Sequence, residues 1–152
     1  LAKGYRLGFV GSGDSHDGHP GLVHLASGGG GIAAILSEER TRESVLAALR
    51  ARRTYATNGA RIVLDVELDR RPMGSVVPVS ASGRLVVKVA TPDPLDRIDL
   101  VADGQVVDSI PGEEKRMVAF ESQIRSSGPG TLYVRVLQTN GGAAWSSPFF
   151  LE

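Results

Sequence analysis

The chain contains 152 residues, of which 41% are hydrophobic and 22% are charged, so its composition is that of a folded protein. Its 17 Lys and Arg residues balance 17 Asp and Glu residues, which argues against a nucleic-acid partner, since contacts with phosphates need a basic surplus. The absence of cysteine excludes disulfides and thiolate metal sites, and no apolar run approaches the roughly 18 residues that span a bilayer, so we expect no membrane segment.

The first residues have the pattern of an interior strand. The chain begins at Leu1 without an initiator Met, and residues 6–10 form a mostly apolar run that ends in Gly11-Ser12-Gly13. We therefore expect the chain to be a fragment of a longer protein. Residues 32–36 predict a second short strand, of the kind that is buried on both faces of a sheet.

A helix is predicted to begin at Thr41, because its hydroxyl can cap the free N–H groups of the first turn. Three arginines at positions 50, 52 and 53 crowd the last turn, and we interpret them as solvated cations at the negative helix end. Tyr55 begins a return to extended chain, and its ring is expected to pack the helix against a sheet while its hydroxyl finds a polar partner. Strand, helix and extended chain in this order resemble the last unit of an α/β arrangement.

From residue 60 onwards the hydrophobic period changes to two, which predicts about seven short strands separated by turns. Asp103-Gly104 and Asn140-Gly141 are strong signals for hairpin turns. The pattern favours an immunoglobulin-like β-sandwich over residues 60–152. The sequence therefore predicts an α+β, mostly β protein, in which residues 1–59 are the end segment of a (β/α) barrel and residues 60–152 an accessory domain.

The strongest candidate for chemistry is Asp14 with His16, directly after the glycine-rich turn. A carboxylate and an imidazole two residues apart at the end of a strand can point to the same side, and both are ligands for Zn, Mn or Fe. On spacing alone, a polar surface turn closed by Asp and Ser side chains is the favoured alternative. His19 lies within reach of the same ion or of a bound substrate, although histidines in loops are usually just exposed.

A longer series of residues carries a resemblance to a known family. It consists of Gly11-Ser12-Gly13-Asp14-Ser15-His16, Pro20-Gly21, Gly31-Ile32-Ala33-Ala34-Ile35, Thr41-Arg42-Glu43-Ser44-Val45 with Ala48-Leu49, and Arg53-Thr54-Tyr55-Ala56-Thr57-Asn58-Gly59-Ala60-Arg61-Ile62. In this order the series resembles the end of the PHP (polymerase and histidinol phosphatase) family, in particular a branch of larger hydrolase-like proteins. The family's fold is a distorted (β/α)₇ barrel, and its last metal motif is an Asp-x-His at the end of a late strand.

The resemblance implies that Asp14 and His16 ligate ions of a multinuclear metal cluster that acts on a small phosphoester. The family's other ligands come from earlier motifs, a His-x-His among them, that this chain lacks. We therefore expect the fragment alone to be inactive and to bind no metal tightly, because two ligands do not hold a catalytic ion. Arg61 is a candidate for contact with a phosphate oxygen, and a structural salt bridge is the favoured alternative.

Two functions follow from these patterns. The chain is expected to be the C-terminal part of a PHP-like phosphoesterase, whose partner is the missing N-terminal barrel of the same protein. That barrel would cover an apolar face formed by Phe9, Val10, Ile32, Ile35 and Leu36, through which the isolated fragment could form homodimers. The alternative is a non-catalytic β-sandwich that binds a ligand or partner, with the first part as a remnant.

Overall fold

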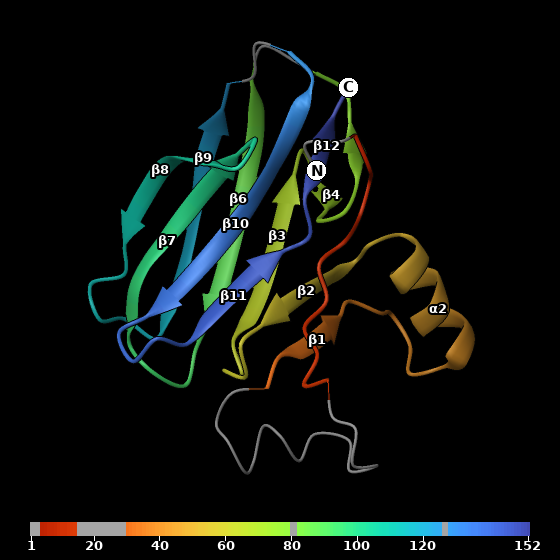
Figure 1. Ribbon diagram of the computed structural model, residues 1–152. Helices are drawn as coiled ribbons and strands as arrows, with labels where there is room; N and C mark the ends of the chain where they lie inside the picture. Colours follow the sequence, from red (N-terminus) through yellow and green to blue (C-terminus); the bar gives the residue numbers. More distant parts are fainter. Residues whose placement is uncertain (1–3, 15–29, 80–81, 126–127) are drawn as a thin grey trace.

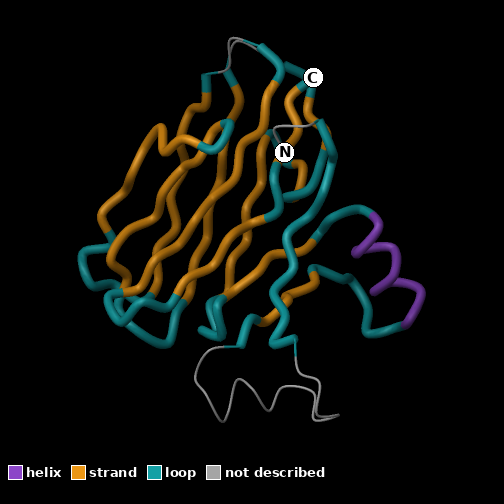
Figure 2. Tube along the Cα trace, in the orientation of Figure 1, coloured by secondary structure: helices purple, strands orange, loops and turns teal. Residues whose placement is uncertain are grey.

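The computed structural model describes residues 4–14, 30–79, 82–125 and 128–152, and in these ranges the protein is mostly β, with one helix beside two packed sheets (Figures 1 and 2). The larger sheet has eight strands: β1 (Ile32–Ile35), β2 (Thr54–Thr57), β5 (Val76–Val77), β7 (Leu95–Ala102), β8 (Gln105–Pro111), β10 (Gly130–Gln138), β11 (Ala143–Ser146) and β12 (Phe149–Leu151). The smaller sheet has four: β4 (Arg71–Pro72), β3 (Val63–Leu68), β6 (Gly83–Ala90) and β9 (Met117–Ile124).

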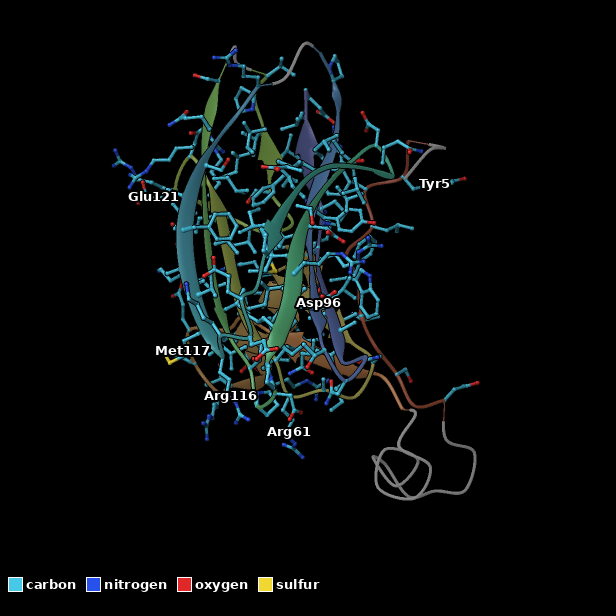
Figure 3. All side chains as sticks on the ribbon, turned by 90° about the vertical axis from the view of Figure 1, so that its left-hand side faces the viewer. Tyr5, Arg61, Asp96, Arg116, Met117 and Glu121 are labelled. Carbon is cyan, nitrogen blue, oxygen red and sulfur yellow. The ribbon has the colours of Figure 1, made fainter. Side chains whose placement is uncertain are left out.

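The core lies between the two sheets and follows the predicted alternation. On β3, Leu64, Val66 and Leu68 are buried, whereas Val63 on the outer face is 62% exposed. The inward residues of β6 and β10 meet them from both layers, and they are Leu85, Val87, Val89, Leu132, Val134 and Val136. Seen along the sheets, the side chains fill the space between the layers, while Glu121 and Met117 project from the outside of the smaller sheet (Figure 3). The mostly β, sandwich-like expectation is therefore confirmed.

Both predicted hairpins are present. Asp103 and Gly104 connect β7 to β8 with left-handed φ values of 48° and 81°, which two-residue turns of this kind require. The turn at Asn140-Gly141 connects β10 to β11, and their first pair is Leu137 with Ala143. The two-residue strands β4 and β5 were not predicted, because so short a pairing leaves no period in the sequence.

The predicted strand at residues 6–10 is wrong. This stretch has no strand pairing. Residues 4–10 instead cross the outer side of the larger sheet as an extended segment, here called the strap (Figure 1). Side chains hold it there: the Phe9 N–H donates to Ser147 Oγ at 2.9 Å, and the Phe9 carbonyl accepts from Thr54 Oγ1 at 2.9 Å. An apolar run looks the same in a sequence whether its backbone pairs with a strand or with side chains of a sheet.

The predicted second strand exists as β1, but its burial on both faces is wrong. β1 forms one edge of the larger sheet, and its burial alternates between half-buried and exposed residues. It pairs antiparallel with β2, with Ala33 opposite Ala56, so the two strands and the helix between them are not a parallel α/β unit. β2 in turn pairs with β11, and one sheet thus runs from residues 32–57 into the later part of the chain without closing into a barrel.

Helix α2 (Arg42–Arg50) begins as predicted, with the Ser44 N–H donating to the Thr41 hydroxyl at 3.2 Å. Only Ala48 of this helix is buried, and Leu46 and Leu49 remain 37% and 39% exposed. The interpretation of Arg52 as a solvated cation is wrong.

Arg52 fastens the end of α2 to the sandwich. Its Nε donates to the Gly74 carbonyl at 2.9 Å, and its guanidinium lies 5.5 Å from the centre of the Phe150 ring. A left-handed φ of 58° at Arg52 turns the chain there, and Gly74 has no side chain to prevent the approach, since a Cβ would lie 2.2 Å from the Arg52 carbonyl oxygen.

A buried carboxylate ties three strands of the larger sheet together. Asp99 on β7 accepts from Arg135 Nε of β10 at 2.9 Å, from Ser109 Oγ of β8 at 2.8 Å and from Arg97 Nε at 3.2 Å. Burial opposes ionisation, but the hydrogen bonds from Arg135 and Ser109 outweigh it, so the pKa of Asp99 lies below its ordinary value. The ionised carboxylate therefore stabilises the folded state.

We predict that Asp99→Asn lowers the free energy of unfolding near neutral pH by about 1–3 kcal/mol, because it leaves Arg135 without its charge partner. A depressed pKa contributes stability above the unfolded value of about 4, and that contribution is lost as the pH falls through the folded value. The difference between the parent chain and the variant in urea unfolding should therefore shrink below about pH 4. Glu67→Gln on β3 is the control, and an equal, pH-independent loss in both variants would contradict the account.

Candidate functional site

The loop that carries Asp14 starts from a close crossing of two glycines. The Gly31 N–H donates to the Ser12 carbonyl at 3.2 Å, just beside the start of β1. A Cβ on Gly11 would lie 2.5 Å from the Ile32 carbonyl oxygen and 2.8 Å from the Thr57 carbonyl oxygen, so only glycine allows this approach. The crossing lies beside the start of β1, the edge strand of the larger sheet (Figure 1).

Asp14 follows directly on this crossing and is exposed to solvent. Its backbone is left-handed, with φ of 48°, and its N–H donates to Ser12 Oγ at 3.1 Å. This hydrogen bond belongs to the polar-turn interpretation of the motif, in which Ser and Asp close a turn. It engages the backbone N–H of Asp14.

His16 and His19 lie outside the residues that the structure describes. Arg61 is exposed just before β3, at the end of the sandwich where Arg116 also lies (Figure 3). Within the described ranges, no group of three or more His, Asp or Glu side chains is placed to hold a metal ion.

The residues around β2 that contribute to the family resemblance have structural roles. The Tyr55 hydroxyl donates to the Ile62 carbonyl at 2.9 Å, and burial raises the pKa of this phenol. Asn58 bonds across to the hairpin before β11, donating to the Gly141 carbonyl at 2.9 Å and accepting from the Ala143 N–H at 2.8 Å. The Thr57 hydroxyl accepts from the Gly59 N–H at 3.1 Å. This stretch therefore joins the first part of the chain to the sandwich.

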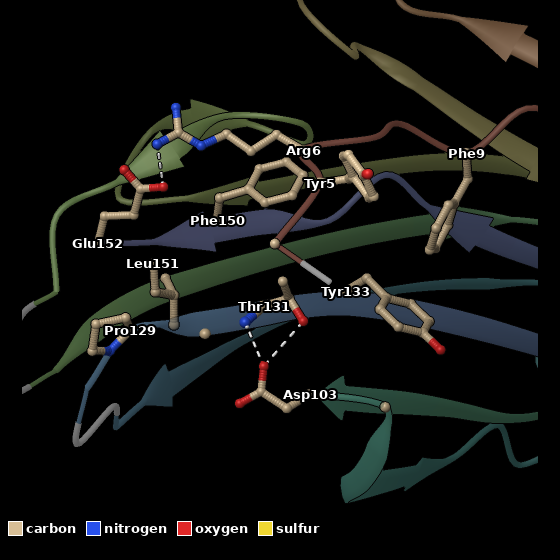
Figure 4. A pocket seen from close by; sticks show the side chains of 13 residues that line it. Tyr5, Arg6, Phe9, Asp103, Pro129, Thr131, Tyr133, Phe150, Leu151 and Glu152 are labelled. Atoms are coloured by element: carbon tan, nitrogen blue, oxygen red, sulfur yellow. Dashed lines mark hydrogen bonds and ion pairs between the residues drawn. The ribbon is translucent and has the colours of Figure 1, made fainter. Parts of the chain in front are cut away.

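A groove of about 600 Å³ on the outer side of the larger sheet is a feature that the sequence did not reveal (Figure 4). Residues 4–9 of the strap form one wall of the groove. The hairpin turn at Asp103 lies opposite, and β10 and β12 lie between the two. Four aromatic residues line it: Tyr5, Phe9, Tyr133 and Phe150. Alternation on β10 predicts that Tyr133 points outward, but the apolar run at residues 6–10 has the same pattern as a strand, so the sequence could not predict the groove.

Residues 21–66 match a family described as "Protein of unknown function (DUF3604)". The chain is 30% identical over 177 aligned residues to an uncharacterized protein of Chlamydia pneumoniae, covering 100% of this chain and 28% of that relative. It is 26% identical over 140 residues to uncharacterized proteins of Chlamydia muridarum and Chlamydia trachomatis, covering 80% of this chain and 22% of each relative. The chain thus spans less than a third of the length of these relatives. No helix in the described ranges has the length and apolar character to cross a membrane.

We predict that Gly11→Ala destabilises the protein by about 1–3 kcal/mol, since its Cβ would force apart the backbone of β1 and β2. Gly128→Ala is the matched control, because a Cβ at Gly128 would meet nothing within 4 Å. Thermal unfolding of both variants checks the prediction. Equal melting temperatures of the two variants would show that the backbone around Gly11 can accommodate a Cβ without loss of stability.

Proposed function

We propose that the chain is the C-terminal part of a PHP-like, metal-dependent phosphoesterase in which Asp14 and His16 supply one arm of the metal site. The ordered series from Gly11 to Ile62 carries the proposal, because it links the Asp-x-His pair to a specific succession of turns, helix and strand. The glycine crossing supports it, since it brings Asp14 to the edge of a sheet, where ligands on other segments could approach.

In such a site, divalent Zn, Mn or Fe ions would polarise the phosphoryl oxygens and lower the pKa of an attacking water. Asp14 would contribute a carboxylate oxygen and His16 a neutral ring nitrogen, the donor types that these metals accept. His19 and Arg61 are candidates for the substrate side of the site. Arg61 is exposed and can offer two parallel N–H groups to a phosphate.

Exposed apolar side chains on the first part of the chain support a larger parent protein. Of the five residues predicted to form an apolar face, only Val10 at 60% and Ile35 at 37% are exposed, whereas Phe9 packs against Tyr133 and Leu36 against the core. Leu46 and Leu49 on α2 add two further exposed apolar side chains, at 37% and 39%. Soluble proteins seldom leave so many large apolar residues uncovered within one region. We propose that the rest of the parent protein covers them, in keeping with relatives of which this chain spans 28% or less. A second copy of the chain is the alternative occupant.

In the full-length parent, we expect Asp14→Asn to reduce both the metal content and phosphoesterase turnover by more than about 100-fold, because even the loss of a group that only orients a metal ligand costs about 10–100-fold. Elemental analysis and hydrolysis of a generic aryl phosphate are the measurements, with His16→Gln as the second ligand variant. Asp108→Asn makes the same chemical change on β8 and serves as the control. Unchanged metal content in both ligand variants would remove the proposed role of this pair.

We also expect Leu46→Gln to have different effects in the two proteins. In the 152-residue chain it should change the free energy of unfolding by less than about 0.5 kcal/mol, since the side chain is exposed and both residues favour helix. In the parent it should cost about 1–3 kcal/mol if the rest of the protein buries Leu46. Urea unfolding of the chain and of the parent protein, each with and without Leu46→Gln, measures the two effects. Val107→Thr on the exposed strand β8 is the control. Equal small effects in chain and parent would indicate that α2 faces solvent in both.

A further inference from the structure

The groove beside the strap combines aromatic walls with a negative charge. Of the three charged residues that line it, Arg6 and Glu152 form an ion pair with each other at one end. Asp103 forms no ion pair with any residue in the described part of the chain. It accepts only neutral hydrogen bonds, from the Thr131 N–H at 2.7 Å and from the Thr131 hydroxyl at 3.1 Å. The lining thus carries one carboxylate without a cation.

The fold holds Asp103 against the floor of the groove. The left-handed hairpin turn directs it toward β10, and Gly130 leaves room for it, since a Cβ there would come within 2.7 Å of Asp103 Oδ2. Both bonds from Thr131 go to Oδ1, so the described residues give Oδ2 no hydrogen-bond donor. In the close view, Asp103 lies on the other side of Thr131 from Tyr5 and Phe150 (Figure 4).

The rings of the groove are not equally available. Arg52 already lies over one face of Phe150, and Phe150 itself is 4% exposed. Phe9 meets Tyr133 edge-on, with ring centres 5.3 Å apart and planes at 81°, which fixes the Tyr133 ring between the strap and Thr131. Tyr5 is 63% exposed on the strap. Tyr5 and Tyr133 are therefore the rings that a ligand would meet first.

We propose that this groove binds a ligand with an organic ammonium group, whose charge lies between Asp103 and the tyrosine rings. Aromatic faces attract cations through the ring quadrupole, and a carboxylate without a cation adds a charge partner. A neutral sugar could donate a hydroxyl to Asp103 Oδ2 and stack on a ring, but only a cation gains from the charge of the carboxylate. The inference does not rest on the metal-ligand proposal, because it uses only the residues that line the groove.

Choline is the probe, and its titration into the 152-residue chain can be followed by two-dimensional amide NMR. Shifts should cluster at the residues that line the groove. The neutral alcohol 3,3-dimethyl-1-butanol has the shape of choline, with carbon in place of the quaternary nitrogen, but carries no charge. It should bind at least about threefold more weakly than choline. Glucose tests the sugar alternative. Binding of the neutral isostere or of glucose as tight as that of choline, or no choline shifts at the groove, would overturn the proposal.

Variants locate the binding in the groove. Asp103→Asn keeps an acceptor for Thr131 and tolerates the left-handed backbone, and it should raise the Kd for choline at least about threefold. Tyr133→Leu should do the same, whereas Tyr133→Phe and Asp108→Asn should stay within about twofold of the parent chain. Amide spectra of each variant report whether it is folded. If Tyr133→Leu unfolds, the Kd for choline of Asp103→Asn is still compared with that of Asp108→Asn. Equal Kd values for these two variants would contradict the placement of the ammonium group beside Asp103.

Discussion

The pairing of β2 with β11 is the contact on which the rest of the structure depends. It places Ala56 beside Trp145 and Thr57 beside Ala144, joining two segments that are far apart in the sequence. Without it, β1, α2 and the strap would have no sheet to lie against. Because of it, the Thr54 and Ser147 side chains meet at 3.0 Å in the interior and together hold the backbone of Phe9. The first part of the chain is thus an extension of the sandwich sheet.

This continuity determines where both candidate sites lie. Asp14, which we propose as a metal ligand, follows the strap just past Gly11, whose backbone lies against Ile32 of the edge strand β1. The groove lies further along the same strap, between Tyr5 and the Asp103 turn. One extended segment, fastened by side chains and not by strand pairing, therefore contributes to both. Mutations that loosen Phe9 should affect the two sites together, whereas changes on β9 should affect neither.

Much of the sandwich could be predicted because its signals are local. Alternation along β3 and β10, the two hairpin turns and the Thr41 cap each depend on residues close together in the sequence, and all are present. The direction of β1 relative to β2 could not be predicted, since strand pairing depends on which segment is in reach after folding. The same applies to Arg52, whose partner Gly74 lies on another element, and to the groove, which needs Tyr5 and Tyr133 on opposite segments. The role of Asp14 as a metal ligand rests on its motif and on the family resemblance, and it stays a prediction.

The two outer surfaces of the first segment differ in chemistry, and the difference bears on what each can bind. Around α2 and β1, the exposed large apolar residues include Val10, Ile35, Leu46 and Leu49, aliphatic side chains that gain from burial against another apolar surface, although charged residues such as Arg42 and Glu43 are exposed beside them. Along the strap, exposed Tyr5 lies near a carboxylate, a combination that gains from charge as well as from area. We propose a protein partner for the first surface and a small charged ligand for the second. Burial alone would stabilise the aliphatic side chains in the first case, whereas in the second the attraction between opposite charges would add to the gain from contact area.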